Sequence, residues 1–241
     1  AFSYIPARLT EGYGINAEAV TTLAGQAGLL ISVDCGITAV EEVRLARSLG
    51  MTVILTDHHT LPDTLPPADA IVHPQLADYP DPSLCGAGVA WKLSCALLGL
   101  ERAMTGLDLA ALATVADLVP LQGENRVIVS LGLKALQHTD RPGLRELMRI
   151  AGISEGAMVH SEHVAFQIAP RLNAGGRLAT AQEALSLLLT REPERAVTLA
   201  ARLDSLNRER REVEQLVQKE AAALLRNVDL SQRRSIVLYQ P

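Results

Sequence analysis

Two short apolar runs separated by a helical stretch constrain the fold of this chain most strongly. Residues 29–33 (Leu-Leu-Ile-Ser-Val) and 51–56 (Met-Thr-Val-Ile-Leu-Thr) are typical of buried strands, and residues 39–49 have the 3.6-residue apolar period of a helix. This order predicts a βαβ unit, in which the crossover returns the chain to a neighbouring parallel strand. The expected fold class is therefore α/β, with a parallel β-sheet flanked by helices.

A polar cluster follows each of these two strands. Asp34-Cys35-Gly36 follows the first strand, and Asp57-His58-His59 follows the second. Because open α/β sheets bind ligands at the carboxyl ends of their strands, we expect two carboxylates and two imidazoles to meet in one crevice. Carboxylate oxygens and imidazole nitrogens suit a divalent ion such as Mn²⁺ or Mg²⁺, and two such ions suit the attack of water on a phosphoester.

Each cluster also has a purely structural interpretation. Asp34 could cap the helix that follows it, but Thr38 and Glu41 are expected to form a Thr-x-x-Glu capping box there, four residues later. A single histidine in a loop is more often structural than a ligand. His58 and His59, however, are adjacent and stand behind an aspartate at a strand end, which is a rarer arrangement. The metal interpretation is therefore favoured.

Charge is unevenly distributed along the 241 residues. Residues 1–140 carry 7 Lys and Arg against 15 Asp and Glu, whereas residues 141–241 carry 15 against 12, so the balances are −8 and +3 within a net charge of −5. The first part could hold a metal and the second could meet phosphates. Arginines interleaved with glutamates on a helix are equally typical of an ordinary salt-bridged surface.

Composition argues against several classes of protein. The sequence has no apolar run of membrane-spanning length and does not open on a signal segment, so the expected location is cytoplasmic. Aromatic residues make up only 3% of the chain, which argues against a platform of several aromatic side chains for stacked bases. The three cysteines have no Cys-x-x-Cys spacing, so neither a zinc site nor a disulfide framework is supported.

Beyond the βαβ unit the pattern becomes helical after a third short strand at 70–72. Helices are predicted from Gly86 onward and at 107–116, 126–138, 144–151, 163–168 and 181–189, followed by one long amphipathic helix at 195–226. Helices of that length usually connect domains or form coiled coils. We expect a first domain at 1–190, a connecting helix at 191–230 and the truncated start of a second domain at 231–241.

Two further segments carry chemistry. Asp117 ends an apolar helix, where a lone carboxylate is more often a helix-end residue than a ligand. Residues 170–178 follow a predicted helix and offer Arg171, Asn173 and Arg177 around a flexible diglycine. Guanidinium groups suit phosphate oxygens, and glycines permit close backbone approach. The alternative is a turn at the helix end with surface arginines.

These motifs together resemble the DHH phosphoesterase superfamily and, within it, the RecJ-like single-strand-specific exonucleases. The superfamily resemblance depends on Asp34-Cys35-Gly36, Asp57-His58-His59 and Asp117. The narrower resemblance depends on four further segments, which are residues 13–15, 84–93, 116–121 and 170–178. The segments occur in the family's order over nearly the whole chain.

The resemblance implies an activity and a cellular role. In such hydrolases two Mn²⁺ or Mg²⁺ ions activate a water molecule, which attacks the terminal phosphodiester of single-stranded DNA from its 5′ end. It also implies a nuclease of DNA repair and recombination, with single-stranded-DNA-binding protein and a helicase as partners.

Residue roles follow from the same resemblance. Asp34 corresponds to the bridging metal ligand, and His58 and Asp117 correspond to ligands of one metal. His59 resembles the imidazole that faces the scissile phosphate, and Asp57 would orient its neighbours from behind the ligands. The segment that lines the substrate side contains Arg171, Asn173 and Arg177.

One family motif is missing. The superfamily has an aspartate-rich first strand, yet no Asp-x-Asp occurs before Asp34. One metal therefore keeps three ligands and the other keeps only Asp34. We expect this chain to be the central part of a nuclease, to hold at most one ion well and to hydrolyse DNA poorly by itself.

Two other functions stay open. A DHH hydrolase could act on small phosphoesters such as pyrophosphate, cyclic dinucleotides or short oligonucleotides, although the segments around Trp91 and Arg171 argue against this. Length preference in a nuclease assay separates these two hydrolases. A non-catalytic DHH scaffold in a replication complex is the third possibility, and the four retained metal-site residues disfavour it.

Overall fold

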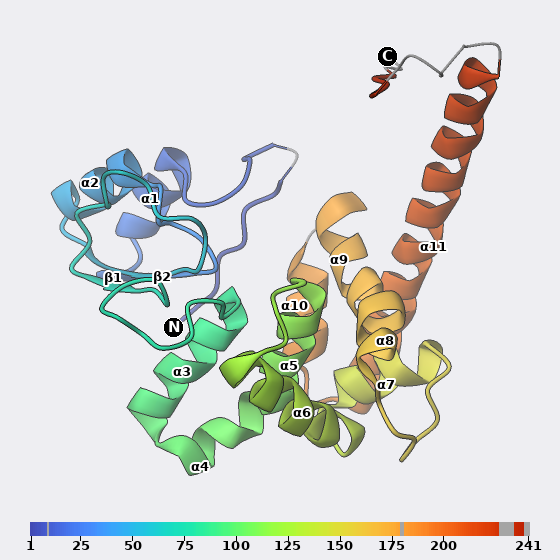
Figure 1. Cartoon of the computed structure of the whole chain (residues 1–241). Helices are drawn as coiled ribbons and strands as arrows, with labels where there is room; N and C mark the ends of the chain where they lie inside the picture. Colours follow the sequence, from blue (N-terminus) through green and yellow to red (C-terminus); the bar gives the residue numbers. More distant parts are fainter. Residues whose placement is uncertain (9, 179–180, 227–233, 239–241) are drawn as a thin grey trace.

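The structure is a computed structural model that describes residues 1–8, 10–178, 181–226 and 234–238. A small sheet with its helices forms the N-terminal part, and the rest of the described chain is almost entirely helical (Figure 1). None of the described helices is long and apolar enough to cross a membrane.

The sheet has three parallel strands in the order β1 (Leu29–Val33), β2 (Thr52–Thr56) and β3 (Ala70–Val72). Helices α1 (Ala17–Ala24) and α2 (Val40–Ser48) contact each other, and α2 also packs on β2. The small core between them contains Val20, Val43, Ala46, Met51, Val53 and Leu55. The βαβ prediction is confirmed, because β1 and β2 are adjacent and parallel and therefore end at the same edge.

Residues 29–33 form the predicted strand, but the prediction that this strand is buried is wrong. β1 lies at the edge of the sheet, and the side chains of Leu29, Ile31 and Val33 are about half exposed. Only Ser32 is buried, where its hydroxyl donates to the carbonyl of Cys35 at 2.7 Å. An apolar run indicates a strand, but it does not report how many faces of that strand are covered.

The capping box predicted at Thr38 and Glu41 is also wrong. Helix α2 begins at Val40 and follows Ala39, which makes no side-chain capping hydrogen bond. The turn before the helix is instead held from the neighbouring strand end, because the amide of Ile37 donates to Asp57 Oδ2 at 2.9 Å. A buried carboxylate from another element therefore fixes the turn before α2, and the helix itself has no side-chain cap.

A first group of helices joins the sheet to the rest of the molecule. It consists of α3 (Gly86–Leu98), α4 (Leu100–Ala103), the 3₁₀ turn η1 (Met104–Gly106), α5 (Leu107–Ala116) and α6 (Gly123–Gln137). Helix α3 contacts both β1 and β2, and α5 packs against α3 and α6. A side chain at Gly132 would overlap Ala111, so α5 and α6 can approach closely only because this position is glycine. The carboxyl end of α5 is thereby fixed relative to the sheet.

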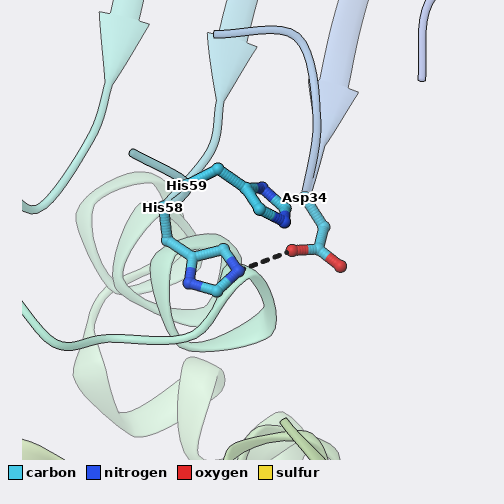
Figure 2. Close-up of side chains that lie close together, drawn as sticks. All are labelled: Asp34, His58 and His59. Atoms are coloured by element: carbon cyan, nitrogen blue, oxygen red, sulfur yellow. Dashed lines mark ion pairs between the residues drawn. The ribbon is translucent and has the colours of Figure 1, made fainter. Parts of the chain in front are cut away.

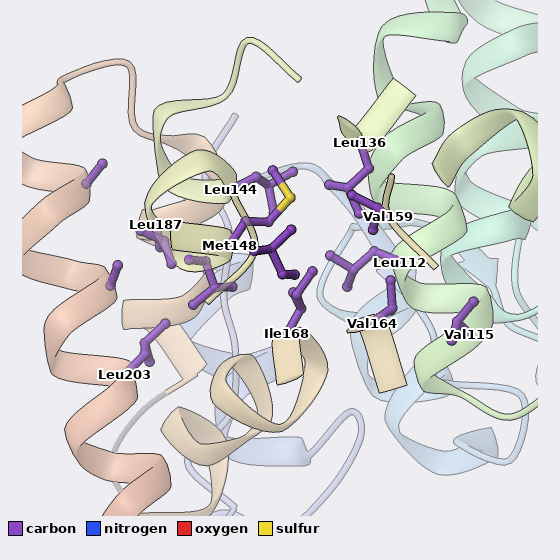
Figure 3. Close-up of a cluster of buried hydrophobic side chains, with 14 of the residues drawn as sticks. Leu112, Val115, Leu136, Leu144, Met148, Val159, Val164, Ile168, Leu187 and Leu203 are labelled. Carbon is purple, nitrogen blue, oxygen red and sulfur yellow. The ribbon is translucent and has the colours of Figure 1, made fainter. Parts of the chain in front are cut away.

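A second group of helices encloses the larger core. It consists of α7 (Pro142–Ile150), α8 (Ser161–His163), the π-helical turn η2 (Val164–Ile168), α9 (Ala169–Leu178), α10 (Ala181–Leu189) and α11 (Pro193–Leu225). Figure 3 shows side chains from these helices and from α5 and α6 meeting in this core, among them Leu112, Leu136, Leu144, Ile168, Leu187 and Leu203.

Helix α9 corrects another prediction. Residues 170–178 form a helix rather than a flexible diglycine turn. Helix α9 follows the π-helical turn η2 without a break, so Pro170 lies inside a continuous helical segment, and its missing amide hydrogen removes one hydrogen bond next to the π-helical turn. The arginines of this segment are therefore presented by a regular element.

The long helix α11 has a buried half and an exposed half. Ala196, Ala200 and Leu203 are completely buried, whereas Val213 and Leu224 are more than half exposed. Figure 1 shows the second half, in red, extending beyond its neighbours. The predicted helix at 195–226 is confirmed. Its role as a connector and the limits 1–190, 191–230 and 231–241 remain predictions, and residues 227–233 and 239–241 lie outside the described residues.

Candidate metal centre

Four of the predicted site residues meet where β1, β2 and α5 end. Ligand atoms of Asp34, His58 and His59 all lie within 4.8 Å of one another, and Figure 2 shows these side chains close together below the strand ends. His58 Nε2 lies 3.1 Å from Asp34 Oδ1 and 3.6 Å from Asp117 Oδ2. The structure thus brings Asp117 to His58, although the two are far apart in sequence.

The position of Asp34 is set by its backbone and by helix α3. Asp34 has a φ of +63°, which is uncommon for a residue with a side chain, and its amide donates to the carbonyl of Thr56 at 3.0 Å. The hydroxyl of Tyr13 donates to the carbonyl of Asp34 at 3.0 Å. A side chain at Gly86 would overlap the Asp34 carboxylate. Helix α3 therefore begins with a glycine where the carboxylate needs space.

Asp57 is a buried hub rather than an open ligand. Its Oδ2 accepts from the amide of Ile37, and its Oδ1 accepts from the amide of His58 at 2.7 Å and from Nδ1 of His59 at 2.7 Å. Burial acts to raise the pKa of Asp57, but these hydrogen bonds outweigh it and lower the pKa below its ordinary value. Asp57 thus fixes the His59 ring and leaves Nε2 as its free nitrogen.

His58 supplies an observation that points directly to a cation. Its Nε2 is buried and makes no hydrogen bond of regular geometry among the described residues, although it faces two carboxylates. The interaction with Asp34 raises the pKa of His58, with burial acting in the opposite direction. Burial raises the pKa of Asp117. An unsatisfied nitrogen between carboxylate oxygens is a donor set that fits Mn²⁺ or Mg²⁺.

Sequence reasoning assigned no role to His73, which supports the same site. His73 is buried, its Nε2 donates to the carbonyl of His59 at 2.8 Å, and its Nδ1 accepts from the amide of Gln75 at 3.1 Å. Burial lowers the pKa of His73, which favours the neutral ring that these two bonds require. His73 directly follows the third strand, and all three strands end at one edge of the sheet. This position in the sequence could therefore have indicated that His73 lies near the site.

The predicted substrate residues lie on α9, apart from the cluster. Arg171 Nε lies 2.9 Å from Asp204 Oδ1 on α11, and Asp204 Oδ2 lies 2.8 Å from Arg208. Asn173 is exposed. No hydrogen bond or ion pair links Arg171 or Asn173 to the Asp34 cluster among the described side chains, and the side chain of Arg177 lies outside them.

A family model and the curated relatives point to the same group of proteins. Residues 2–119 match the family described as "DHH family, N-terminal domain". The chain is 45% identical over 237 residues to the single-stranded-DNA-specific exonuclease RecJ of Bacillus subtilis (strain 168), which covers 97% of this chain and 30% of that protein.

Solved structures agree with this relationship. An exonuclease RecJ bound to manganese matches with a TM-score of 0.79 and 38% identity, over 94% of this chain and 57% of the other. RecJ of Thermus thermophilus in complex with Mn²⁺ matches with a TM-score of 0.78 and 39% identity, over 85% of this chain and 31% of the other. Its Mg²⁺ complex matches with a TM-score of 0.64 and 36% identity, over 80% and 27%.

The similarity is therefore extensive along this chain and partial along its relatives. The chain spans about 30% of the Bacillus subtilis relative's length and 57% of the manganese-bound structure's length. Sequence profile, overall identity and structure nevertheless agree on one relationship: residues 2–119 match the DHH family, and nearly the whole chain is similar to RecJ exonucleases.

Proposed function

We propose that this chain is the metal-binding part of an exonuclease that hydrolyses phosphodiester bonds of single-stranded DNA. The observation that carries the proposal is the buried, unsatisfied Nε2 of His58 between the carboxylates of Asp34 and Asp117. The similarity to single-stranded-DNA-specific exonucleases supports the choice of substrate. Digestion from the 5′ end is what the family resemblance implies.

The proposed roles follow the geometry. Asp34, His58 and Asp117 would hold a Mn²⁺ or Mg²⁺ ion, which when bound would neutralise phosphate charge and lower the pKa of a water molecule. His59, oriented by Asp57, would present its free Nε2 to the scissile phosphate. His73 would keep the His59 backbone in place. We propose at most one well-liganded ion in this chain, because Asp34, His58, His59 and Asp117 form a single cluster of candidate ligands among the described side chains.

The substrate path is proposed to continue to α9. Arg171, Asn173 and Arg177 would contact phosphates, with Asp204 orienting the Arg171 guanidinium. Roles in DNA repair and recombination, partnership with single-stranded-DNA-binding protein and a helicase, and a cytoplasmic location belong to the same proposal.

A paired assay tests the proposal. Mn²⁺ binding to the 241-residue chain is measured by calorimetry, and hydrolysis by the full-length protein is measured on single-stranded, double-stranded and very short DNA labelled at the 5′ end. We expect Mn²⁺ binding that is lost in His58→Ala, and release of nucleotides from long single strands. Preference for dinucleotides or pyrophosphate would favour a small-phosphoester hydrolase, and metal binding without any hydrolysis would favour the scaffold.

A further inference from the structure

A small apolar hollow begins at the residue that follows Asp117. It has a volume of about 240 Å³ and lies between the carboxyl end of α5, the loop after it and the turn formed by α8 and η2. Its apolar lining includes Val115, Leu118, Val119, Leu121, Ala165 and Phe166. Of the residues that line the hollow, Leu118, Val119 and Leu121 belong to the segment 116–121, and the others lie outside the motifs on which the family resemblance depends.

Two of its side chains are unusually exposed. Leu118 is 84% exposed and Phe166 is 70% exposed. Leu118 also has a φ of +59°, a left-handed conformation that is costly for a residue with a branched side chain. Phe166 lies on the π-helical turn η2, and such turns are frequent at functional sites. Strain and apolar exposure together are expected where a ligand contact compensates for them.

We propose that this hollow binds one nucleobase of the single-stranded DNA whose phosphate lies at the candidate metal centre, with the Phe166 ring stacked on the base and Leu118 packed against it. This inference rests on the proposed function and names a subsite of it. Stacking on an aromatic ring tolerates any base, because every base has a flat π-face. One such ring is compatible with the scarcity of aromatic residues in the chain.

The size and charge of the hollow favour a base over other occupants. Ordinary small-molecule pockets have volumes of about 300 to 1,000 Å³, so a hollow of about 240 Å³ suits a single heterocycle. Its lining has no cation, and its one charged residue is Glu162, so the hollow does not suit a phosphate. The hydroxyls of Thr114 and Ser161 in the same lining already donate to the Ala110 carbonyl and to Glu162, so the hollow offers a base stacking and apolar contact rather than recognition of its edge.

The hollow lies next to the candidate metal centre because Leu118 follows Asp117 in the chain. Consecutive Cα atoms lie about 3.8 Å apart, so Leu118 stands next to Asp117 in space as well as in sequence. Asp117 Oδ2 in turn lies 3.6 Å from His58 Nε2. A nucleotide whose phosphate is held at this cluster therefore brings its own base, or that of its neighbour, within reach of Leu118 and Phe166.

Binding of abasic DNA tests the subsite. Fluorescence anisotropy measures binding of the full-length protein to phosphorothioate-protected single strands that carry one abasic site at successive positions, in Mn²⁺. We expect loss of the base at one position to weaken wild-type binding about tenfold, the size of one base–aromatic stack. Phe166→Ala should weaken binding to intact DNA about tenfold, and it should not weaken binding to the abasic strand any further. Phe166→Trp should restore binding to intact DNA.

Leu97 provides a matched control for the loss of exposed apolar surface. Leu97 on α3 is 73% exposed, so Leu97→Ala removes a similar apolar surface elsewhere and should leave binding unchanged. Equal binding of intact and abasic DNA by wild type and Phe166→Ala would overturn the subsite while leaving the proposed function intact. Absence of any single-strand binding by wild type would overturn both. Unchanged DNA binding together with loss of self-association in Leu118→Ala would assign the hollow to a second copy of the chain.

Discussion

Two aspartates at the ends of neighbouring strands have opposite environments. Asp57 is buried and accepts hydrogen bonds from three backbone amides and one imidazole, so its oxygens are fully engaged. The Asp34 side chain is 54% exposed, has a left-handed backbone and faces His58. The same residue type at the same kind of position thus orients the site in one case and is free to bind a ligand in the other.

Replacement of Asp34 should have the largest effect on activity. In the full-length protein, Asp34→Ala should reduce the hydrolysis rate by about a thousandfold or more, because a lost metal ligand removes several kcal/mol of transition-state stabilisation. Its thermal unfolding should change little, since an exposed carboxylate near another carboxylate contributes little to stability. Near wild-type hydrolysis would contradict the assignment of Asp34 as a ligand.

Replacement of Asp57 should affect the fold instead. Asp57→Ala leaves the Ile37 and His58 amides without their acceptor, so we expect a loss of about 3 kcal/mol in the free energy of unfolding, measured by urea denaturation. Because the folded-state pKa of Asp57 lies below its ordinary value of 3.8, its contribution is present above that pH and is lost as the pH falls through the lower folded value. A variant as stable as the wild type would remove the distinction between the two aspartates.

Protonation of His58 should compete with metal binding. The pKa of His58 is raised above its ordinary value of 6.5, chiefly by Asp34. Mn²⁺ affinity should therefore be highest above this raised pKa and fall about tenfold per pH unit below it, because the proton and the metal compete for Nε2. Without metal, the stability of the fold depends on pH in the opposite direction from the Mn²⁺ affinity. Protonated His58 stabilises the fold at low pH, and this stabilisation is lost as the pH rises through its folded pKa. A flat pH profile of Mn²⁺ affinity between about 5 and 8 would exclude His58 as a ligand.

A substitution at Gly86 tests whether Asp34 needs the space beside this glycine, and it leaves the Asp34 carboxylate itself unchanged. Gly86→Ala places a methyl group where the Asp34 carboxylate lies, so Mn²⁺ affinity should fall about tenfold, as for other changes behind a metal ligand. Gly88→Ala, on the same helix, meets only ordinary contacts and serves as the matched control. Equal Mn²⁺ affinity in the two variants would show that Asp34 can adjust.

Asp204 acts on Arg171 as Asp57 acts on His59, and this gives the smallest predicted effect. If Arg171 grips a phosphate, Arg171→Ala should lower the salt dependence of single-strand binding by about 0.7 in log–log slope. Arg171→Lys should recover part of that slope but not the bidentate geometry. Metal affinity should stay the same. An unchanged slope in Arg171→Ala would mean that the pair with Asp204 only joins α9 to α11.

The sequence predicted the strand-end residues well for a simple reason. Parallel strands end at one edge, so local patterns were enough to bring Asp34, His58 and His59 together. The same patterns could not show that β1 is half exposed or that Asp57 holds the turn before α2. Such features depend on contacts between residues far apart in sequence.

The pairing of Arg171 shows the same limit. Arg171 and Asp204 are 33 residues apart, and their contact exists only because α9 packs on α11. His73 likewise acts through a carbonyl 14 residues upstream. Contacts between residues of different elements were therefore missed, whereas the meeting of Asp34, His58 and His59 at the strand ends was predicted.

The central claim is that Asp34, His58 and Asp117 hold one divalent ion. The most direct measurement is a crystal structure of the 241-residue chain with Mn²⁺, in which anomalous scattering locates the ion. We predict an anomalous peak about 2.0 to 2.2 Å from Asp34 Oδ1, His58 Nε2 and Asp117 Oδ2. Absence of a peak at this cluster under saturating Mn²⁺, or a peak bound elsewhere, would contradict the account.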